Sequence, residues 1–397
     1  MYRQLFLRHL AQTAPTPLAI EIDRAEGIWL YEPGGKRYMD LIAGIGVSCL
    51  GHRHPRVAAA VREQSDKYWH TMVYGEYVLT PQVRLAQLLS AQLPGLDQVY
   101  LVNSGTEATE GAMKLAKRYT GRPQIVACRR AYHGSTQGAA SLMSPPDFTG
   151  PYHPLLPGIR HIDFNSDADL DLIDRQTAAV IVETVQGEAG VYPARLEWLQ
   201  ALRRRCDETG ALLVLDEIQA GYGRTGALFA FERYEGVRPD ILLLAKGFGG
   251  GMPIGAFVAP QSIMKVLSFN PPLGHITTFG GHPVCAAAAL ATLETLLESD
   301  LIAQAPEKGA LFRRLLTEAC PSIVEIRSDG LWLAVDLGDA RRVQAVIAQC
   351  IEAGIITDWF LFNDRSLRIA PPLIITEEEI SWACERLAAA INASSAL

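Results

Sequence analysis

The segment ILLLAKGFGGG, residues 241–251, joins an uninterrupted apolar run to a glycine-rich loop and places Lys246 at the junction. A continuous run of this length indicates a strand that helices cover on both faces, as in a parallel sheet. Such sheets bind ligands at the carboxyl ends of their strands, which is where Lys246 would lie. Burial would lower the pKa of the lysine and supply the neutral amine that Schiff-base chemistry needs. The position also suits a lysine whose ammonium reaches solvent, so the segment alone leaves both interpretations open.

Apolar runs of the same kind recur between residues 95 and 260 and alternate with segments of helical spacing. We predict further strands at residues 99–102, 124–128, 179–183, 212–215 and 256–259. Residues 107–119 carry Ala108, Ala112, Leu115 and Ala116 at the spacing of one helix face. This alternation predicts an α/β fold with a mostly parallel sheet.

The regions that flank this alternation have a different pattern, which indicates a smaller α+β unit. Residues 27–40 contain the turn Pro33-Gly34-Gly35 between short apolar stretches and are predicted to form a hairpin. After an Ala-rich helix near residues 284–298, we expect strands at 323–326 and 331–335, a helix at about 341–353, another strand pair and a final helix.

The change of pattern predicts two domains in this chain of 397 residues. Residues 55–283 are expected to form a large ligand-binding domain. The terminal segments 1–54 and 284–397 are expected to combine into a small domain.

Composition narrows the class of protein. Apolar residues make up 49% of the chain and charged residues 20%, which is typical of a packed globular enzyme and not of a disordered chain. The net charge is −7, and the short cluster Arg203-Arg204-Arg205 suits a solvated helix face, so we expect no nucleic-acid partner. We expect no membrane span, because no apolar run reaches about 18 residues. The seven cysteines are scattered, which predicts reduced thiols in a cytoplasmic protein.

Two further segments carry polar groups at predicted strand ends. Asp216 follows the apolar run at 211–215, where a carboxylate could hold a pyridine nitrogen protonated or could simply cap a helix. Ser104, Gly105 and Thr106 open the helix after the first strand, where backbone amides and hydroxyls suit a phosphate. Ser104 and Glu107 also have the spacing of a capping box, and the two interpretations are compatible.

Six motifs together resemble one enzyme family. They are SGTEA (104–108), YHG (132–134), DEIQAGYGRTG (216–226), AKGFGGGMPIGA (245–256), TTFGG (277–281) and LRIAPPL (367–373). In order and spacing the set is similar to class III pyridoxal-phosphate aminotransferases of the ornithine, acetylornithine and ω-amino acid type, from about Gly27 to the final helix. The resemblance implies PLP fold type I, as in aspartate aminotransferase, with a mostly parallel seven-stranded sheet in the large domain.

The resemblance also implies which residues hold pyridoxal 5'-phosphate. The expected set is Ser104, Gly105, Thr106, Tyr132, His133, Glu183, Asp216, Gln219, Lys246 and Thr278. Lys246 would be the Schiff-base lysine and the proton shuttle, and Asp216 would pair with the pyridine nitrogen. Gln219 would bind the phenolic oxygen, and Tyr132 would stack on the ring. Thr278 is expected to reach the phosphate of a neighbouring subunit, which implies a homodimer with shared active sites.

The substrate-binding residues expected from the resemblance are Glu188, Arg368, Ile45 and Ser135. In similar enzymes the glutamate bridges the arginine while an ω-amino donor is bound, and it moves aside for a dicarboxylate acceptor. A fixed Glu188–Arg368 pair remains the alternative. Ser135 is a departure, because ornithine and acetylornithine enzymes usually carry an arginine after YHG that grips a carboxylate. Ile45 stands where ornithine enzymes have an aromatic residue.

These observations predict an aminotransferase that moves an amino group from an ω-amino donor, such as acetylornithine, ornithine or 4-aminobutyrate, to a 2-oxo acid, with 2-oxoglutarate expected. Diaminopelargonate-type or ω-amine:pyruvate-type transaminases and a glutamate-1-semialdehyde-type aminomutase remain alternatives. A dehydrogenase is disfavoured, because the glycine loop has Met252 where a dinucleotide fingerprint needs glycine. No metal site is expected, since His52 and His54 lack a cluster of further ligands. A scaffold that had lost its chemistry would have lost Lys246 or Asp216.

Overall fold

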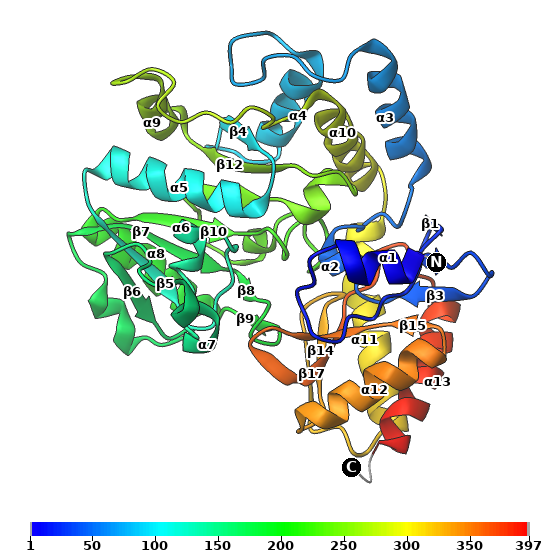
Figure 1. Cartoon of the computed structure of the whole chain (residues 1–397). Coiled ribbons are helices and arrows are strands. Elements are labelled where there is room, and N and C mark those ends of the chain that lie inside the picture. Colours follow the sequence, from blue (N-terminus) through cyan, green and yellow to red (C-terminus); the bar gives the residue numbers. More distant parts are fainter. Residues whose placement is uncertain (1, 395–397) are drawn as a thin grey trace.

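The computed structural model describes residues 2–394 and has an α/β architecture built on a seven-stranded sheet (Figure 1). The strand order is β4-β12-β11-β10-β7-β5-β6. The strands are β4 (Gln98–Val102), β5 (Gln124–Cys128), β6 (Ile159–Ile162), β7 (Thr177–Glu183), β10 (Leu212–Asp216), β11 (Ile241–Leu244) and β12 (Gly255–Ala259). Only the two pairings of β12 in this sheet are antiparallel, so the predicted mostly parallel sheet is confirmed.

The central strands read as continuous apolar runs because helices cover both faces of the sheet. On one face Leu213 and Leu215 share a core with Trp198 of α8 (Leu196–Thr209). On the other face Leu212 and Val214 share a core with residues of α5 (Gly105–Thr120), such as Ala112. Successive strand residues therefore alternate between two cores, and neither face needs polar residues.

One strand and one helix show why some elements were not predicted from the sequence. The edge strand β6 contains Arg160 and His161 and is only partly buried, so it lacks the apolar run that marks the inner strands. The helix α11 (Leu301–Ala319) contains Pro306, a residue type that disfavours a helix interior, and it buries only Ala305, Gly309, Phe312 and Leu316.

The terminal segments of the chain build two smaller sheets, which lie together in Figure 1 as the blue and the orange to red regions. One sheet contains β1 (Arg24–Glu26), β2 (Trp29–Tyr31), β3 (Arg37–Asp40) and β15 (Ile355–Ile356). The other contains β13 (Glu325–Ser328), β14 (Leu333–Asp336), β16 (Asp358–Phe360) and β17 (Asn363–Ile369). The predicted hairpin is confirmed as the β2–β3 pair, and β15 joins it in parallel from the far end of the chain.

The remaining elements are helices, short turns of 3-10 helix and one two-stranded ribbon. The other helices are α1 (Tyr2–His9), α2 (Ala43–Gly46), α3 (Pro55–Lys67), α4 (Thr80–Ala91), α6 (Gln137–Ala140), α7 (Pro146–Thr149), α9 (Gln261–Met264), α10 (Pro283–Leu297), α12 (Ala340–Glu352) and α13 (Glu377–Ala393). The 3-10 turns are η1 (Gly150–Tyr152), η2 (Ala168–Leu172), η3 (Ala230–Arg233), η4 (Lys246–Gly249) and η5 (Lys265–Ser268), and the ribbon pairs β8 (Val185–Gln186) with β9 (Tyr192–Pro193). In the described residues, no helix combines the length and the apolar character needed to cross a bilayer.

Candidate active site

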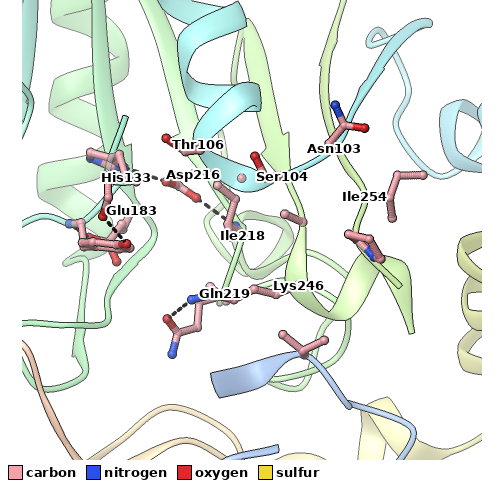
Figure 2. Close-up of a pocket in the computed structure, with 18 of the residues that line it drawn as sticks. Asn103, Ser104, Thr106, His133, Glu183, Asp216, Ile218, Gln219, Lys246 and Ile254 are labelled. Carbon is pink, nitrogen blue, oxygen red and sulfur yellow. Dashed lines mark hydrogen bonds and ion pairs between the residues drawn. The ribbon is translucent and has the colours of Figure 1, made fainter. Parts of the chain in front are cut away.

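A pocket of about 640 Å³ lies where β10 and β11 end and α5 begins (Figure 2). It is lined by Val47, Asn103, Ser104, Gly105, Thr106, Tyr132, His133, Gly134, Ser135, Thr136, Glu183, Val185, Glu188, Asp216, Ile218, Gln219, Ala220, Ala245, Lys246, Gly251, Met252, Pro253 and Ile254. Every residue predicted for the site lines this pocket except Ile45, Thr278 and Arg368. Its volume is within the usual range of small-molecule sites.

Lys246 follows β11 and begins the turn η4, so its side chain is held at the floor of the pocket. Its Nζ donates a hydrogen bond to Oε1 of Gln219 at 2.6 Å. Burial lowers the pKa of Lys246 below its usual value, although Glu188 and Asp216 act in the opposite direction. Lys246 is half-buried and lines the pocket, so its amine lies within the site and not on the outer surface.

A left-handed turn packs against this lysine. Ala43, Gly44, Ile45 and Gly46 have φ values of 48°, 59°, 64° and 73° in succession. Left-handed backbone costs an L-residue about 1–2 kcal/mol, and more for a β-branched side chain such as Ile45. Asp40 holds the turn, because its carboxylate accepts from the N–H groups of Ile42 and Gly44 at 2.9 and 3.0 Å.

The strained turn brings backbone close to the reacting groups. An added Cβ on Gly46 would lie 3.6 Å from Cγ of Gln219 and 3.9 Å from Cδ of Lys246. Lys246 itself has a φ of 49°. Strain of this kind concentrates at functional sites, where the surrounding structure enforces it.

Asp216 ends β10 and is almost completely buried. Its Oδ2 lies 2.7 Å from Nδ1 of His133, and its Oδ1 accepts from the N–H of Ile218 at 2.9 Å. Burial opposes the charged form of His133, but the hydrogen bond and the charge of Asp216 outweigh it and raise the histidine pKa. Asp216 thus has a fixed partner behind it and faces the pocket (Figure 2).

The start of α5 forms an anion cradle. The Oγ of Ser104 accepts from the N–H of Glu107 at 3.2 Å, which confirms the predicted cap. The reciprocal half of the predicted capping box is absent, because the Glu107 carboxylate accepts from Asn103 instead. Gly105 and Thr106 line the pocket at the positive end of the helix dipole, where a phosphate binds favourably.

Thr136 and Glu110 support this cradle. Thr106 and Thr136 share a hydrogen bond of 2.7 Å between their hydroxyl oxygens, and Thr136 donates to Oε1 of Glu110 at 2.6 Å. Because the proton of Thr136 is used for Glu110, Thr106 is the donor to Thr136. The sequence offered no sign of this chain of contacts, since Thr136 lies 30 positions from its partner.

Glu183, at the end of β7, holds the segment that carries Tyr132. Its carboxylate accepts from the N–H groups of Tyr132 and Gly187 at 3.2 and 2.8 Å. Burial raises the pKa of Glu183 to about 7, against the opposing charge of His133. The Tyr132 hydroxyl in turn lies 2.9 Å from Oγ of Ser135, which is exposed at the mouth of the pocket.

Glu188 and Arg368 form a buried bidentate ion pair. Nη1 and Nη2 of Arg368 each donate to a different oxygen of Glu188 at 2.9 Å. Burial and Arg368 act in opposite directions on Glu188, and the arginine prevails, so the pKa of Glu188 is lowered. Glu188 lines the pocket and Arg368 lies behind it, so the carboxylate covers the cation.

Two predicted residues lie away from the pocket of their own chain. Thr278 is exposed in the loop before α10. Ile45 lies on the left-handed turn and is 36% exposed, whereas Val47, which follows the turn, lines the pocket. Ile218, Met252 and Ile254 also line the pocket and were not predicted, although each lies within a quoted motif.

The pocket residues suit pyridoxal 5'-phosphate. The pocket combines a cradle for a phosphate, a buried carboxylate for a ring nitrogen and a lysine for a carbonyl carbon. Nε2 of His133 and Nε2 of Gln219 are buried without a hydrogen-bond partner in the described structure, and both residues line the pocket. Buried polar groups are normally satisfied, so these atoms point to a polar ligand.

Comparison with known proteins gives a consistent result. The family Aminotransferase class-III matches residues 10–391. The chain is 38% identical to an acetylornithine aminotransferase of Archaeoglobus fulgidus over 95% of this chain and 97% of that protein. It is 42% identical to one of Methanopyrus kandleri, over 93% of each chain.

Solved structures agree with these sequence relatives. The ornithine aminotransferase of Toxoplasma gondii superposes with a TM-score of 0.91 at 31% identity, over 99% of this chain and 94% of that chain. An (S)-enantioselective ω-transaminase of Thermomicrobium roseum superposes with a TM-score of 0.90 at 29% identity, over 99% of both chains. The chain therefore belongs to the class-III aminotransferase family, and it is a PLP-dependent enzyme of fold type I.

Proposed function

We propose that this enzyme transfers an amino group from a donor with a terminal amine to a 2-oxo acid, with 2-oxoglutarate as the expected acceptor. The observation that carries the proposal is the Glu188–Arg368 pair, in which the carboxylate faces the pocket and hides the guanidinium. A terminal amine brings no carboxylate next to its reacting carbon and is compatible with the covered arginine. A 2-oxo acid needs the arginine, whose planar fork binds a carboxylate through two hydrogen bonds.

We assign the proton transfer to Nζ of Lys246, which we propose as the Schiff-base lysine. Its lowered pKa favours the neutral amine, which can take a proton from the donor carbon. When bound, pyridoxal phosphate supplies a carbonyl carbon for covalent attachment and a ring that withdraws electrons. Asp216 is proposed to keep the ring nitrogen protonated, Gln219 to bind the phenolic oxygen, and Ser104, Gly105 and Thr106 to bind the phosphate.

The assembly, compartment and domain division are further proposals. We propose a homodimer in which Thr278 of each subunit completes the partner's site, since Thr278 is exposed and lies outside its own pocket. We propose a cytoplasmic enzyme, because all seven cysteines are buried and free. Residues 55–283 are proposed as the large domain, and they contain the whole seven-stranded sheet. Segments 1–54 and 284–397, which hold both four-stranded sheets, are proposed as the small domain.

A donor panel tests the reaction. We expect the purified holoenzyme to be yellow and to lose its visible absorbance when a good donor aminates the cofactor. The panel contains acetylornithine, ornithine, 4-aminobutyrate, β-alanine and simple diamines. Bleaching by terminal amines, followed by recovery of the colour with 2-oxoglutarate, supports the proposal. Failure of every terminal amine, with bleaching by α-amino acids alone, contradicts it.

Ser135 favours the second candidate function, an ω-amine:pyruvate-type or diaminopelargonate-type transaminase. An arginine at this position would grip a substrate carboxylate, and charged hydrogen bonds contribute about 1.5–3 kcal/mol. Ser135 offers one hydroxyl, which already contacts Tyr132. Donors that carry no carboxylate lose nothing when serine replaces this arginine. An aminomutase of glutamate-1-semialdehyde type remains a weaker candidate, because Glu188 and Arg368 serve an exchange of two substrates.

Ser135→Arg should improve the use of donors that carry a distant carboxylate. We expect the KM for acetylornithine to fall about tenfold or more, since the exposed position leaves room for a guanidinium. Steady-state kinetics on acetylornithine and on a simple diamine measure the change, and the diamine should gain nothing. Ser135→Lys is the matched control, because a point charge binds a carboxylate less specifically. A wild-type enzyme that responds strongly to acetylornithine alone would show that the serine does not limit this donor.

A further inference from the structure

Arg368 carries a second carboxylate besides Glu188. Asp358 is the residue opposite Arg368 in the antiparallel pairing of β16 with β17. Oδ1 of Asp358 lies 3.0 Å from Nε of Arg368, at an angle that does not suit a hydrogen bond. Glu188 occupies the other edge of the guanidinium through Nη1 and Nη2. One buried guanidinium is therefore shared by two carboxylates, and the group as a whole is negative when both are ionised.

The rest of the pocket does not offset this charge. Among the described residues that line it, Lys246 is the only lysine or arginine, whereas Glu183, Glu188 and Asp216 are carboxylates. Ser135 supplies no charge. A substrate carboxylate that approaches Arg368 thus enters a region of negative potential, and like charges repel strongly where water is scarce.

Asp358 keeps this effect even when Glu188 moves. If a substrate carboxylate replaces Glu188 on Arg368, the number of pairs on the arginine is unchanged, but the displaced Glu188 stays nearby. Three carboxylates then share one guanidinium, whereas without Asp358 there would be two. The arginine does not depend on Asp358 for its position, because Nη2 also donates to the Trp359 carbonyl at 3.0 Å and the guanidinium lies 4.6 Å from the centre of the Phe360 ring.

We infer that Asp358 is a specificity-determining residue that neutralises Arg368 and makes the site favour substrates with no carboxylate against this arginine. The favoured class is terminal amines and diamines, and carboxylate-bearing ligands bind more weakly than a single Glu188–Arg368 pair would allow. The inference rests on the proposed function, because it assumes that substrates reach Arg368 by displacing Glu188.

Asp358→Asn tests this inference as a gain of affinity, which misfolding cannot imitate. The amide keeps an oxygen near Nε of Arg368 and removes the charge. We expect the Kd of glutarate, a dicarboxylate without a reactive carbonyl, to fall about tenfold in the holoenzyme, measured by calorimetry. The Kd of the uncharged diamide of glutarate should change by less than about twofold, since it brings no charge to the site. The KM for 2-oxoglutarate should fall in parallel with the Kd of glutarate.

Asp364→Asn is the matched control, because Asp364 is an exposed carboxylate on the same strand as Arg368. Its glutarate affinity should equal that of the wild type. Unchanged or weaker glutarate binding in Asp358→Asn overturns the inference. If the wild type fails to transaminate any terminal amine, the proposed function fails instead, so the two failures are distinguishable.

The pH dependence gives a second readout. Burial raises the pKa of Asp358 to about 6, and the negative charges of Glu188 and Asp40 add to the rise. The positive charges of Arg368 and Lys246 act in the opposite direction. Asp358 therefore gains a proton as the pH falls through about 6 and loses its effect on Arg368. The ratio of wild-type to Asp358→Asn glutarate Kd should fall towards one between about pH 7 and about pH 5. Ligand ionisation cancels in this ratio, and a ratio that stays constant contradicts the inference.

Discussion

Lys246→Ala is expected to lower the turnover number by about 10⁴-fold or more, because the substitution removes both the point of covalent attachment and the proton carrier. Lys246 is the only lysine that lines the pocket in the described part of the chain, and Nζ contacts Gln219 there. No neighbouring amine can replace it. Borohydride reduction should fix the cofactor to the wild-type chain and leave the variant unlabelled, which mass spectrometry of the intact protein measures.

The control for this variant is Lys265→Ala. Lys265 lies exposed at the start of η5, outside the pocket, so its loss should leave both turnover and borohydride labelling unchanged. Retained turnover in Lys246→Ala, or labelling of a different lysine, would refute the assignment of the attachment site. A fall in turnover with normal labelling cannot occur if Lys246 is the attachment point.

The strands of the central sheet were predictable because burial on both faces leaves a simple trace in the sequence. At Leu212–Asp216, alternate residues enter two different cores, so every position must be apolar until Asp216. The polar residues that break these runs then lie at the carboxyl ends of the strands. This is why Lys246 and Asp216 could both be placed at strand ends from their positions, and the family resemblance then assigned them to one site.

Contacts that depend on strand register or on backbone strain could not be predicted from the pattern of apolar residues. Asp358 opposes Arg368 only because the β16–β17 hairpin pairs those two residues, with an irregularity between Trp359 and Phe360. Next to an exposed Trp359, Asp358 has the sequence context of a surface residue. The left-handed turn at residues 43–46 includes Ile45, a residue type that avoids this conformation, so local propensity predicts the wrong backbone there.

Asp216→Asn is expected to lower the turnover number by about 10³-fold while the cofactor stays bound. The amide keeps the size of the side chain and can still accept from the Ile218 N–H, but it carries no charge to hold a proton on the ring nitrogen. The phosphate cradle at Ser104, Gly105 and Thr106 is untouched, so the visible absorbance of the bound cofactor should persist. Turnover at saturating donor and the cofactor content of the same sample separate loss of chemistry from loss of binding.

Glu217→Gln is the matched control for Asp216→Asn, because it changes the adjacent buried carboxylate without touching the pocket. Burial raises the pKa of Glu217 to about 7, so this group is already partly neutral at physiological pH. Its carboxylate accepts from Thr184 and from the N–H groups of Ala230 and Phe231, which hold a loop. We expect the turnover number of Glu217→Gln to stay within about threefold of the wild-type value, because glutamine has nearly the same size and Glu217 does not line the pocket.

A cofactor analogue decides whether the charge of Asp216 is the cause. Pyridoxal phosphate methylated at the ring nitrogen carries a permanent positive charge and does not need a carboxylate to stay protonated. It should restore part of the turnover of Asp216→Asn and should not help Lys246→Ala, whose defect is a missing amine. If the methylated analogue fails with Asp216→Asn while the protein binds it, the carboxylate acts by placing His133 instead, through the 2.7 Å contact with Nδ1. In that case the lower turnover of Asp216→Asn would come from a displaced His133, and a substitution of His133 would lower the turnover number by a similar factor.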